Sequence, residues 1–123
     1  MAETTVLIVE DEMIVALDLE GRLQRLGYSV PATAISGEEA IELAEQIRPD
    51  LIFMDIGLIG AMDGIEAAAL IRARFSIPIV FLTAYTDANT RQRAESASPG
   101  EFLAKPFADD ELLNAIRIAL STE

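Results

Sequence analysis

The sequence contains neither cysteine nor histidine. Without cysteine there is no disulfide framework and no thiolate metal site. Without histidine the chain lacks the commonest general base and the usual zinc ligand, and a Ser-His-Asp triad is excluded. Any chemistry in this chain must therefore rest on carboxylates, hydroxyls and its few basic side chains.

Long apolar runs and positive charges are also scarce. No apolar segment approaches the roughly 20 residues that span a bilayer, and the short, polar segment 1–5 does not fit a signal peptide. Nine Lys and Arg residues stand against 21 Asp and Glu residues, for a formal net charge of −12. Such a surface repels nucleic acid and anionic membranes, so we expect neither as a direct partner. Because the sequence offers neither a membrane-spanning run nor a signal peptide, we expect a cytoplasmic protein.

Four short apolar runs each end at a polar or charged residue. The most continuous is Leu51–Asp55, which lies between Pro49 and Gly57. A run this short and solid is typical of a strand buried on both faces of a parallel sheet. The other three are 6–9 before Glu10, Asp11 and Glu12, 79–82 before Thr83, and 102–104 before Lys105.

Segments with helical spacing of apolar residues alternate with these runs. They are expected at 12–26, from Ser36 to Arg48, from Asp63 to about Phe75, at 87–97, and from about Asp109 to Leu120. The helix at 87–97 has only alanines as apolar anchors, so we expect it to be loosely held.

Two of these helices begin with a capping signal, and the last has a clear apolar stripe. Ser36 with Glu39, and Asp63 with Glu66, have the spacing of N-terminal capping boxes. The stripe of the last helix is expected to consist of Leu112, Leu113, Ile116 and Leu120.

The alternation of five strands with five helices predicts an α/β fold. Short loops between them imply a parallel sheet with helices on both faces and right-handed crossovers. Pro31 lies in the strand expected at 28–34, and because proline cannot donate a ladder hydrogen bond, this strand should be at an edge. With 123 residues, 51% of them hydrophobic, the chain is expected to be a single domain over residues 1–123.

If the strands are parallel, Glu10, Asp11, Asp55, Thr83 and Lys105 meet at the carboxyl edge of the sheet, where open α/β sheets build their sites. Unit charges about 4 Å apart repel by roughly 4 kcal/mol at an effective dielectric near 20, so the carboxylates need a counter-charge. Hard oxygen ligands without nitrogen or sulfur favour Mg²⁺, and Lys105 can neutralise a further charge. A carboxylate in such a site can attack phosphorus, and we assign that role to Asp55.

Each of these residues also has an ordinary structural interpretation. Acids that follow a strand, such as Asp11 and Glu12, often cap the next helix. An isolated Thr83 or Lys105 is usually a strand-end or solvated side chain. The functional interpretation therefore depends on their joint placement at four strand ends.

Five segments, taken in order, resemble the receiver domains of two-component response regulators over essentially the whole chain. They are Leu7–Glu12, Asp50–Asp55, Met62–Gly64, Phe81–Ala84 and Lys105–Phe107. The resemblance implies a flavodoxin-like (βα)5 three-layer sandwich with a five-stranded parallel sheet in the order 2-1-3-4-5. That order agrees with the edge position inferred from Pro31.

The resemblance also implies a phosphorylation site with a metal. Asp55 would accept a phosphoryl group from the phosphohistidine of a sensor histidine kinase or a histidine phosphotransfer protein. Mg²⁺ would be held by Glu10, Asp11, Asp55 and the backbone carbonyl of Gly57. Lys105 would pair with the phosphoryl group.

Further implied features are a cis peptide bond between Lys105 and Pro106 and a switch made of Thr83 and Phe102. This pair would report the phosphorylated state to a downstream effector domain or protein. The reporting face would consist of the helix at 87–97, the strand at 102–104 and the last helix. A homodimer through this face is compatible with the sequence, although its apolar content is too low to predict one.

The sequence departs from the common pattern of this family at several positions. The loop 57–62 lacks the usual proline and is one residue longer, and the segment 98–101 replaces a usual Gly-Ala pair. Phe102 has no phenol hydroxyl. Gly57 has no side chain to shield the phosphoryl group, and Tyr85 is the candidate for that role. The sequence therefore does not predict the lifetime of the aspartyl phosphate.

We expect a phosphoacceptor and not an enzyme with a separate substrate. A phosphatase of the haloacid dehalogenase type needs a second aspartate two residues after the nucleophile, where this chain has Gly57. The other alternative is an interaction module that keeps the fold without the chemistry. The complete set of acids, threonine and lysine at the sheet edge argues against it.

Overall fold

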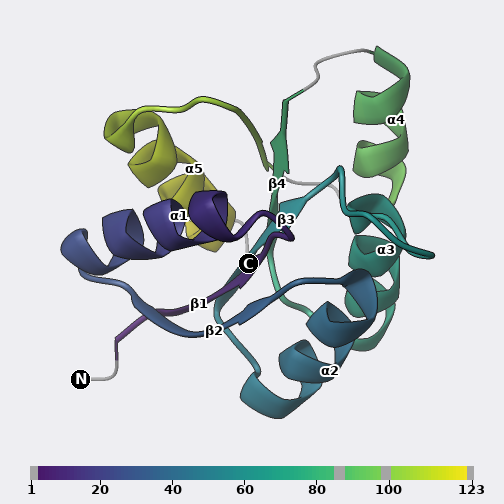
Figure 1. Cartoon of the computed structure of the whole chain (residues 1–123), viewed down its shortest axis with the longest axis horizontal. Helices are drawn as coiled ribbons and strands as arrows, with labels where there is room; N and C mark the ends of the chain where they lie inside the picture. The colour runs from purple at the N-terminus through teal and green to yellow at the C-terminus, as the bar shows by residue number, and fades with distance from the viewer. Residues whose placement is uncertain (1–2, 85–87, 98–100, 122–123) are drawn as a thin grey trace.

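The computed structural model describes residues 3–84, 88–97 and 101–121, in which strands and helices alternate (Figure 1). The strands are β1 Thr5–Val9, β2 Ser29–Ala34, β3 Leu51–Asp55, β4 Ile79–Thr83 and β5 Glu101–Ala104. The helices are α1 Met13–Arg25, α2 Gly37–Ile47, α3 Gly64–Arg74, α4 Ala88–Ala97 and α5 Asp109–Ser121.

The strands form one parallel sheet in the order β2-β1-β3-β4-β5, so the predicted flavodoxin-like topology is confirmed. β2, which contains Pro31, is at the edge, as expected for a strand that cannot donate every ladder bond. Figure 1 shows α1 and α5 on one side of the sheet and α2, α3 and α4 on the other. The expected three-layer sandwich is therefore present.

The core divides into two clusters because successive residues of a strand point to opposite faces. In β3, Leu51 and Phe53 pack toward α1 and α5, whereas Ile52 and Met54 pack toward α2 and α3. All five residues of β3 and of β4 are buried. These two strands read as solid apolar runs because both of their faces are covered.

The capping boxes expected at the N-termini of α2 and α3 differ in which N–H group the glutamate binds. At α3, Asp63 and Glu66 form the full capping box, each side chain accepting from the other residue's backbone N–H. At α2, the Ser36 hydroxyl accepts from the N–H of Glu39, but the Glu39 carboxylate accepts from Ile35, one residue before the N-cap. The expected box at Ser36 is thus only half formed, since the glutamate binds the preceding N–H.

The buried faces of α4 and α5 differ in part from those expected from the sequence. In α5, Leu112 and Ile116 are buried as expected, but Leu113 is 40% exposed and Ala115 and Ala119 complete the inner face instead. Among the described side chains of α4, Ala94 is the buried one, which agrees with the expected weak attachment. In the part of the chain that the structure describes, no helix combines the length and apolarity needed to cross a membrane.

Candidate functional site at the carboxyl edge of the sheet

The register between β1 and β3 brings two acids to the same level of the sheet. Val9 lies opposite Met54, so the residues that follow them, Glu10 and Asp55, are neighbours. Both residues are buried, with 1% of Glu10 and 6% of Asp55 exposed. Asp11 follows Glu10 at the start of the connection to α1.

The register on the other side of β3 brings a threonine and a lysine to the same edge. Thr83 ends β4 and lies opposite Ala104, the last residue of β5. The N–H of Lys105 then donates to the carbonyl of Thr83 at 2.9 Å, which extends the ladder by one bond. The peptide bond between Lys105 and Pro106 is cis.

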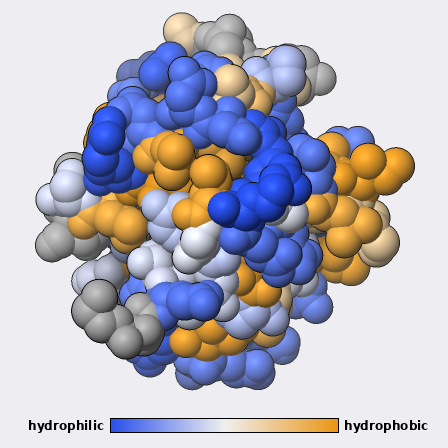
Figure 2. Space-filling view, turned by 90° about the vertical axis from the view of Figure 1, so that its left-hand side faces the viewer, coloured by the Kyte–Doolittle hydropathy of each residue, from blue (hydrophilic) through white to orange (hydrophobic). Residues whose placement is uncertain are grey.

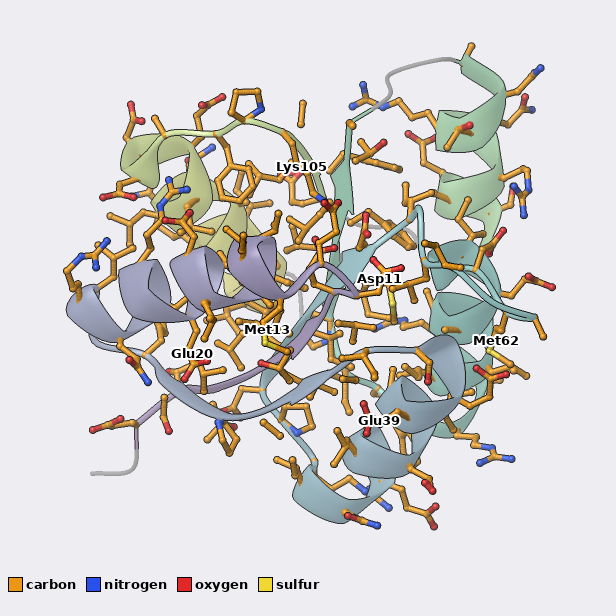
Figure 3. The ribbon with its side chains drawn as sticks, in the orientation of Figure 1. Asp11, Met13, Glu20, Glu39, Met62 and Lys105 are labelled. Atoms are coloured by element: carbon orange, nitrogen blue, oxygen red, sulfur yellow. The ribbon has the colours of Figure 1, made fainter. Side chains whose placement is uncertain are left out.

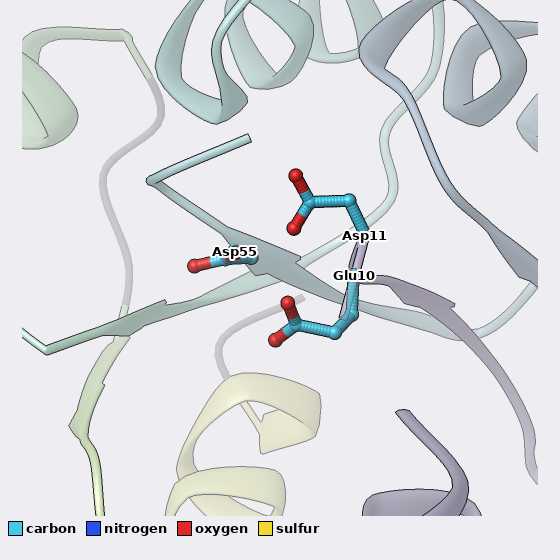
Figure 4. A group of neighbouring side chains, drawn as sticks. All are labelled: Glu10, Asp11 and Asp55. Atoms are coloured by element: carbon cyan, nitrogen blue, oxygen red, sulfur yellow. The ribbon is translucent and has the colours of Figure 1, made fainter. Parts of the chain in front are cut away.

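Three carboxylates converge at this edge (Figure 4). One oxygen from each of Glu10, Asp11 and Asp55 lies within 4.8 Å of the other two. Lys105 reaches the same cluster: its Nζ lies 2.8 Å from Oε1 of Glu10 and 3.4 Å from Oδ1 of Asp55. Figure 3 shows Lys105 and Asp11 at the same end of the sheet, although they follow different strands.

Backbone N–H groups hold each carboxylate in place. Oε2 of Glu10 accepts from Glu12 at 3.2 Å, and Oδ1 of Asp55 accepts from Gly57 at 3.2 Å. Oδ2 of Asp11 accepts from the N–H of Ile59 at 3.0 Å, a bond that ties the loop between β3 and α3 to the end of β1. For Gly57 the structure shows the N–H contact, and the proposed role of its carbonyl as a metal ligand stays a prediction.

The surroundings of the cluster raise the pKa of both Glu10 and Lys105. Burial raises the pKa of Glu10 above its ordinary 4.5, the charge of Asp55 raises it further, and the bond from Lys105 only partly opposes this. Burial alone would lower the pKa of Lys105, but its contacts with Glu10 and Asp55 outweigh burial and raise it. One lysine cannot neutralise three carboxylates, so the site keeps an excess of negative charge.

This donor set fits a magnesium ion. The three convergent groups are hard oxygen ligands, and nearly complete burial of Glu10 makes its charge costly without a cation. Imidazole and thiolate ligands, which favour zinc or copper, are excluded because the sequence has no histidine or cysteine.

The raised pKa of Glu10 leads to a prediction about stability. The folded state binds this proton more tightly than the unfolded chain, so the stabilisation is present below about pH 4.5 and lost as pH rises through the raised pKa. Urea unfolding in metal-free buffer, from acidic to neutral pH, should show the Glu10→Gln variant gaining stability relative to the native chain. Glu42→Gln, at an exposed position of α2, is the control. A constant difference between Glu10→Gln and the native chain would contradict the prediction.

The two residues expected to act as a switch occupy different environments. Thr83 is buried at the end of β4. Phe102 of β5 is partly buried, and its ring stacks on that of Phe81 with centroids 5.5 Å apart. On the α4 side, the guanidinium of Arg91 lies 4.9 Å from the Phe102 ring centroid.

Several features of the site were not predicted from the sequence. The Ile59 bond to Asp11 and the Arg91 contact with Phe102 join residues that no local pattern relates. The expected shielding role of Tyr85 and the unusual turn at 98–100 lie outside the described residues.

A family model described as the response regulator receiver domain matches residues 6–117. The transcriptional regulatory protein PdtaR of Mycobacterium tuberculosis is 41% identical over 116 residues, which cover 94% of this chain and 56% of that protein. The phyllosphere-induced regulator PhyR of Methylorubrum extorquens is 37% identical over 119 residues, which cover 95% and 43%. The chain thus spans about half the length of these curated relatives.

Two solved structures are similar over nearly their whole length. The signal receiver domain of a modulated diguanylate cyclase from Desulfovibrio desulfuricans is 42% identical, with a TM-score of 0.91 and coverage of 98% of this chain and 96% of that one. The receiver domain of a sensor histidine kinase from Pseudomonas aeruginosa is 33% identical, with a TM-score of 0.87 and coverage of 98% and 99%. The latter has a magnesium ion coordinated in its active-site cleft.

Proposed function

The chain belongs to the family of response regulator receiver domains, and we propose that Asp55 is its phosphoacceptor in a Mg²⁺-dependent reaction. The observation that carries this proposal is the convergence of Glu10, Asp11, Asp55 and Lys105 at the end of a fully buried strand. Proteins of this family act in two-component signalling with histidine kinases and effector domains.

The reaction transfers a phosphoryl group to a carboxylate oxygen of Asp55. A new O–P bond forms as the bond from phosphorus to the donor breaks, and the donor leaves with the electron pair. Lys105, already 3.4 Å from Asp55, is placed to pair with the arriving charge, and Thr83 would contribute its hydroxyl. Glu10, Asp11 and Asp55 would hold Mg²⁺, which when bound neutralises charge on the phosphoryl oxygens.

We also propose that the chain is not an enzyme with a separate substrate. Gly57 occupies the position where an aspartyl-phosphate phosphatase would carry its acid, and its N–H binds the Asp55 carboxylate. Sustained hydrolysis of p-nitrophenyl phosphate, over many turnovers per chain, would contradict this.

The experiment that tests the function is the intact mass of the native chain after incubation with acetyl phosphate and Mg²⁺. We expect the mass of one phosphoryl group to be added, and prior chelation of Mg²⁺ to prevent the addition. The donor in the cell is proposed to be a phosphohistidine protein. If neither acetyl phosphate nor a phosphohistidine protein transfers a phosphoryl group to the chain, the proposal is overturned.

The proposed docking surface for the phosphohistidine protein is the start of α1, beside the site. Met13, Ile14 and Leu17 are exposed there, Ile14 to 84%. Figure 2, which faces the side that carries α1 and α5, shows hydrophobic patches set among hydrophilic surface. In the same experiment Ile14→Asp should slow transfer from a protein donor and leave the acetyl phosphate reaction unchanged. Ile118→Asp on α5 is the matched control, and equal rates for both variants would argue against this surface.

The state of Asp55 is proposed to reach the face formed by α4, β5 and α5 through Thr83 and Phe102. What supports this is the weak attachment of α4, which has one buried alanine among its described side chains and two cationic contacts. Arg91 lies over the Phe102 ring, and Arg93 pairs with Asp63 at 3.1 Å. A helix held in this way can shift at low free-energy cost.

Removal of the Arg91 side chain should loosen α4. A cation–π contact at an exposed site contributes about 0.5–1 kcal/mol, so Arg91→Ala should speed hydrogen exchange of the α4 amides about two- to fivefold. Exchange measured by NMR checks this, with Arg117→Ala on α5 as the control. Unchanged exchange in α4 would show that Arg91 does not hold the helix.

A further inference from the structure

Arg22 makes an unusually complete set of contacts between α1 and the segment that follows β5. Its Nη2 donates to the carbonyl of Phe107 and its Nε to Oδ1 of Asp109, both at 2.7 Å. The guanidinium lies 4.8 Å from the centroid of the Phe107 ring, and Nη1 is 3.6 Å from Asp18. The Arg22 side chain is only 15% exposed.

The segment held by Arg22 is the one that carries Lys105. It comprises the four residues 105–108 between the end of β5 and the start of α5. At its first residue, the N–H of Lys105 is bound to the carbonyl of Thr83, and Arg22 binds it near its other end. Lys105 is therefore presented from a short segment that is fixed on both sides.

We propose that Arg22 is a positioning residue for phosphotransfer, holding the segment 105–108 so that Lys105 reaches Glu10 and Asp55. This inference rests on the proposed function and extends it to a side chain that does not touch the reacting atoms. A misplacement of about 1 Å in a reacting group can cost on the order of a hundredfold in rate, so a distant anchor can matter.

The chemistry of arginine suits this task. The planar guanidinium donates in two directions at once, to a carbonyl and to a carboxylate, while its face covers an aromatic ring. A lysine at this position has one ammonium group and cannot reproduce both bonds with the ring contact. Only 15% of the Arg22 side chain is exposed, which limits competing bonds from water.

Lys105 is the one lysine in the sequence, which makes the inference directly testable. In protein labelled with ¹³C-lysine, the ε-methylene signal of the Mg²⁺-free native chain should differ from that of free lysine. Arg22→Ala should move this signal toward the free value, and Arg22→Lys should restore little. Arg25→Ala, an exposed arginine of the same helix, should leave it unchanged. This measurement does not require phosphorylation, so it stands even if the proposed function fails.

The second readout is the initial rate of labelling by acetyl phosphate at saturating Mg²⁺. Arg22→Ala should be about tenfold slower than the native chain, with an Mg²⁺ affinity within about twofold of native. In a Lys105→Met background, Arg22→Ala should cause no further loss of labelling rate, because the two residues act as a unit.

Asp109→Asn removes the carboxylate charge that Arg22 binds and should have a smaller effect of the same kind. This variant tests the inference if Arg22→Ala fails to fold. An unmoved lysine signal in a folded variant, or equal losses in both backgrounds, would overturn the inference.

Discussion

The Asp55→Asn variant should take up no phosphoryl group under any condition that labels the native chain. Asparagine keeps the size of the side chain but replaces the nucleophilic carboxylate with a neutral amide. The surrounding groups, including Lys105 and Gly57, would remain in place. Intact mass after incubation with acetyl phosphate and Mg²⁺ is the measurement, and we expect complete loss of the added mass.

The control for this variant is Asp110→Asn, which makes the same chemical change at an exposed carboxylate in the first turn of α5. It should be labelled like the native chain. Asp55→Asn should also stay folded, because it removes one of three converging negative charges. A folded Asp55→Asn protein that still gains a phosphoryl group would place the acceptor elsewhere and refute the assignment to Asp55.

The sheet could be predicted from the sequence because its central strands are short apolar runs with clear boundaries. β3 and β4 are buried on both faces, so each appears in the sequence as a continuous apolar run that is too short for a buried helix. The edge position of β2 followed from a single residue, Pro31. The meeting of Glu10 and Asp55 then followed from parallel strand pairing, which the register Val9 to Met54 bears out.

What could not be predicted depends on how faces of different elements meet. Leu113 has the spacing of an apolar stripe, but α5 packs with Ala115 and Ala119 facing inward. Leu113 is therefore left at the side of the helix, partly exposed. Arg22 reads as an ordinary charged residue of α1, because its partners Phe107 and Asp109 are 85 and 87 positions away. Local periodicity carries no information about such contacts.

Gly64 is another residue whose role needs the structure. In the sequence it is part of a short segment of family resemblance, Met62–Gly64, and no local pattern requires a glycine there. In the structure it is the first residue of α3 and lies against the backbone of Asp55 and Ile56. A side chain at this position would meet the peptide that carries the proposed phosphoacceptor.

The Gly64→Ala variant should lose both stability and the site. An added Cβ would overlap the carbonyl oxygen of Asp55 and come within 3.0 Å of Cα of Ile56. No rotamer change moves a Cβ away from a backbone that it overlaps, so β3 or α3 must move. We expect a loss of at least about 3 kcal/mol in the free energy of unfolding, at the upper end for overpacked sites. Labelling of Asp55 in the folded fraction should slow by about a hundredfold or more, since its backbone is displaced.

Urea unfolding followed by circular dichroism measures the stability term, and intact mass measures the labelling. Gly21→Ala is the matched control, because Gly21 lies inside α1 and its added Cβ would meet only the flexible end of Arg25, at 3.4 Å. This control should gain about 0.5–1 kcal/mol from the better helix propensity of alanine. The two substitutions are chemically identical, so opposite signs can only come from the surroundings of each glycine. If Gly64→Ala were as stable as the native chain and labelled at the native rate, the close approach of α3 to Asp55 would not be what holds the phosphoacceptor in place.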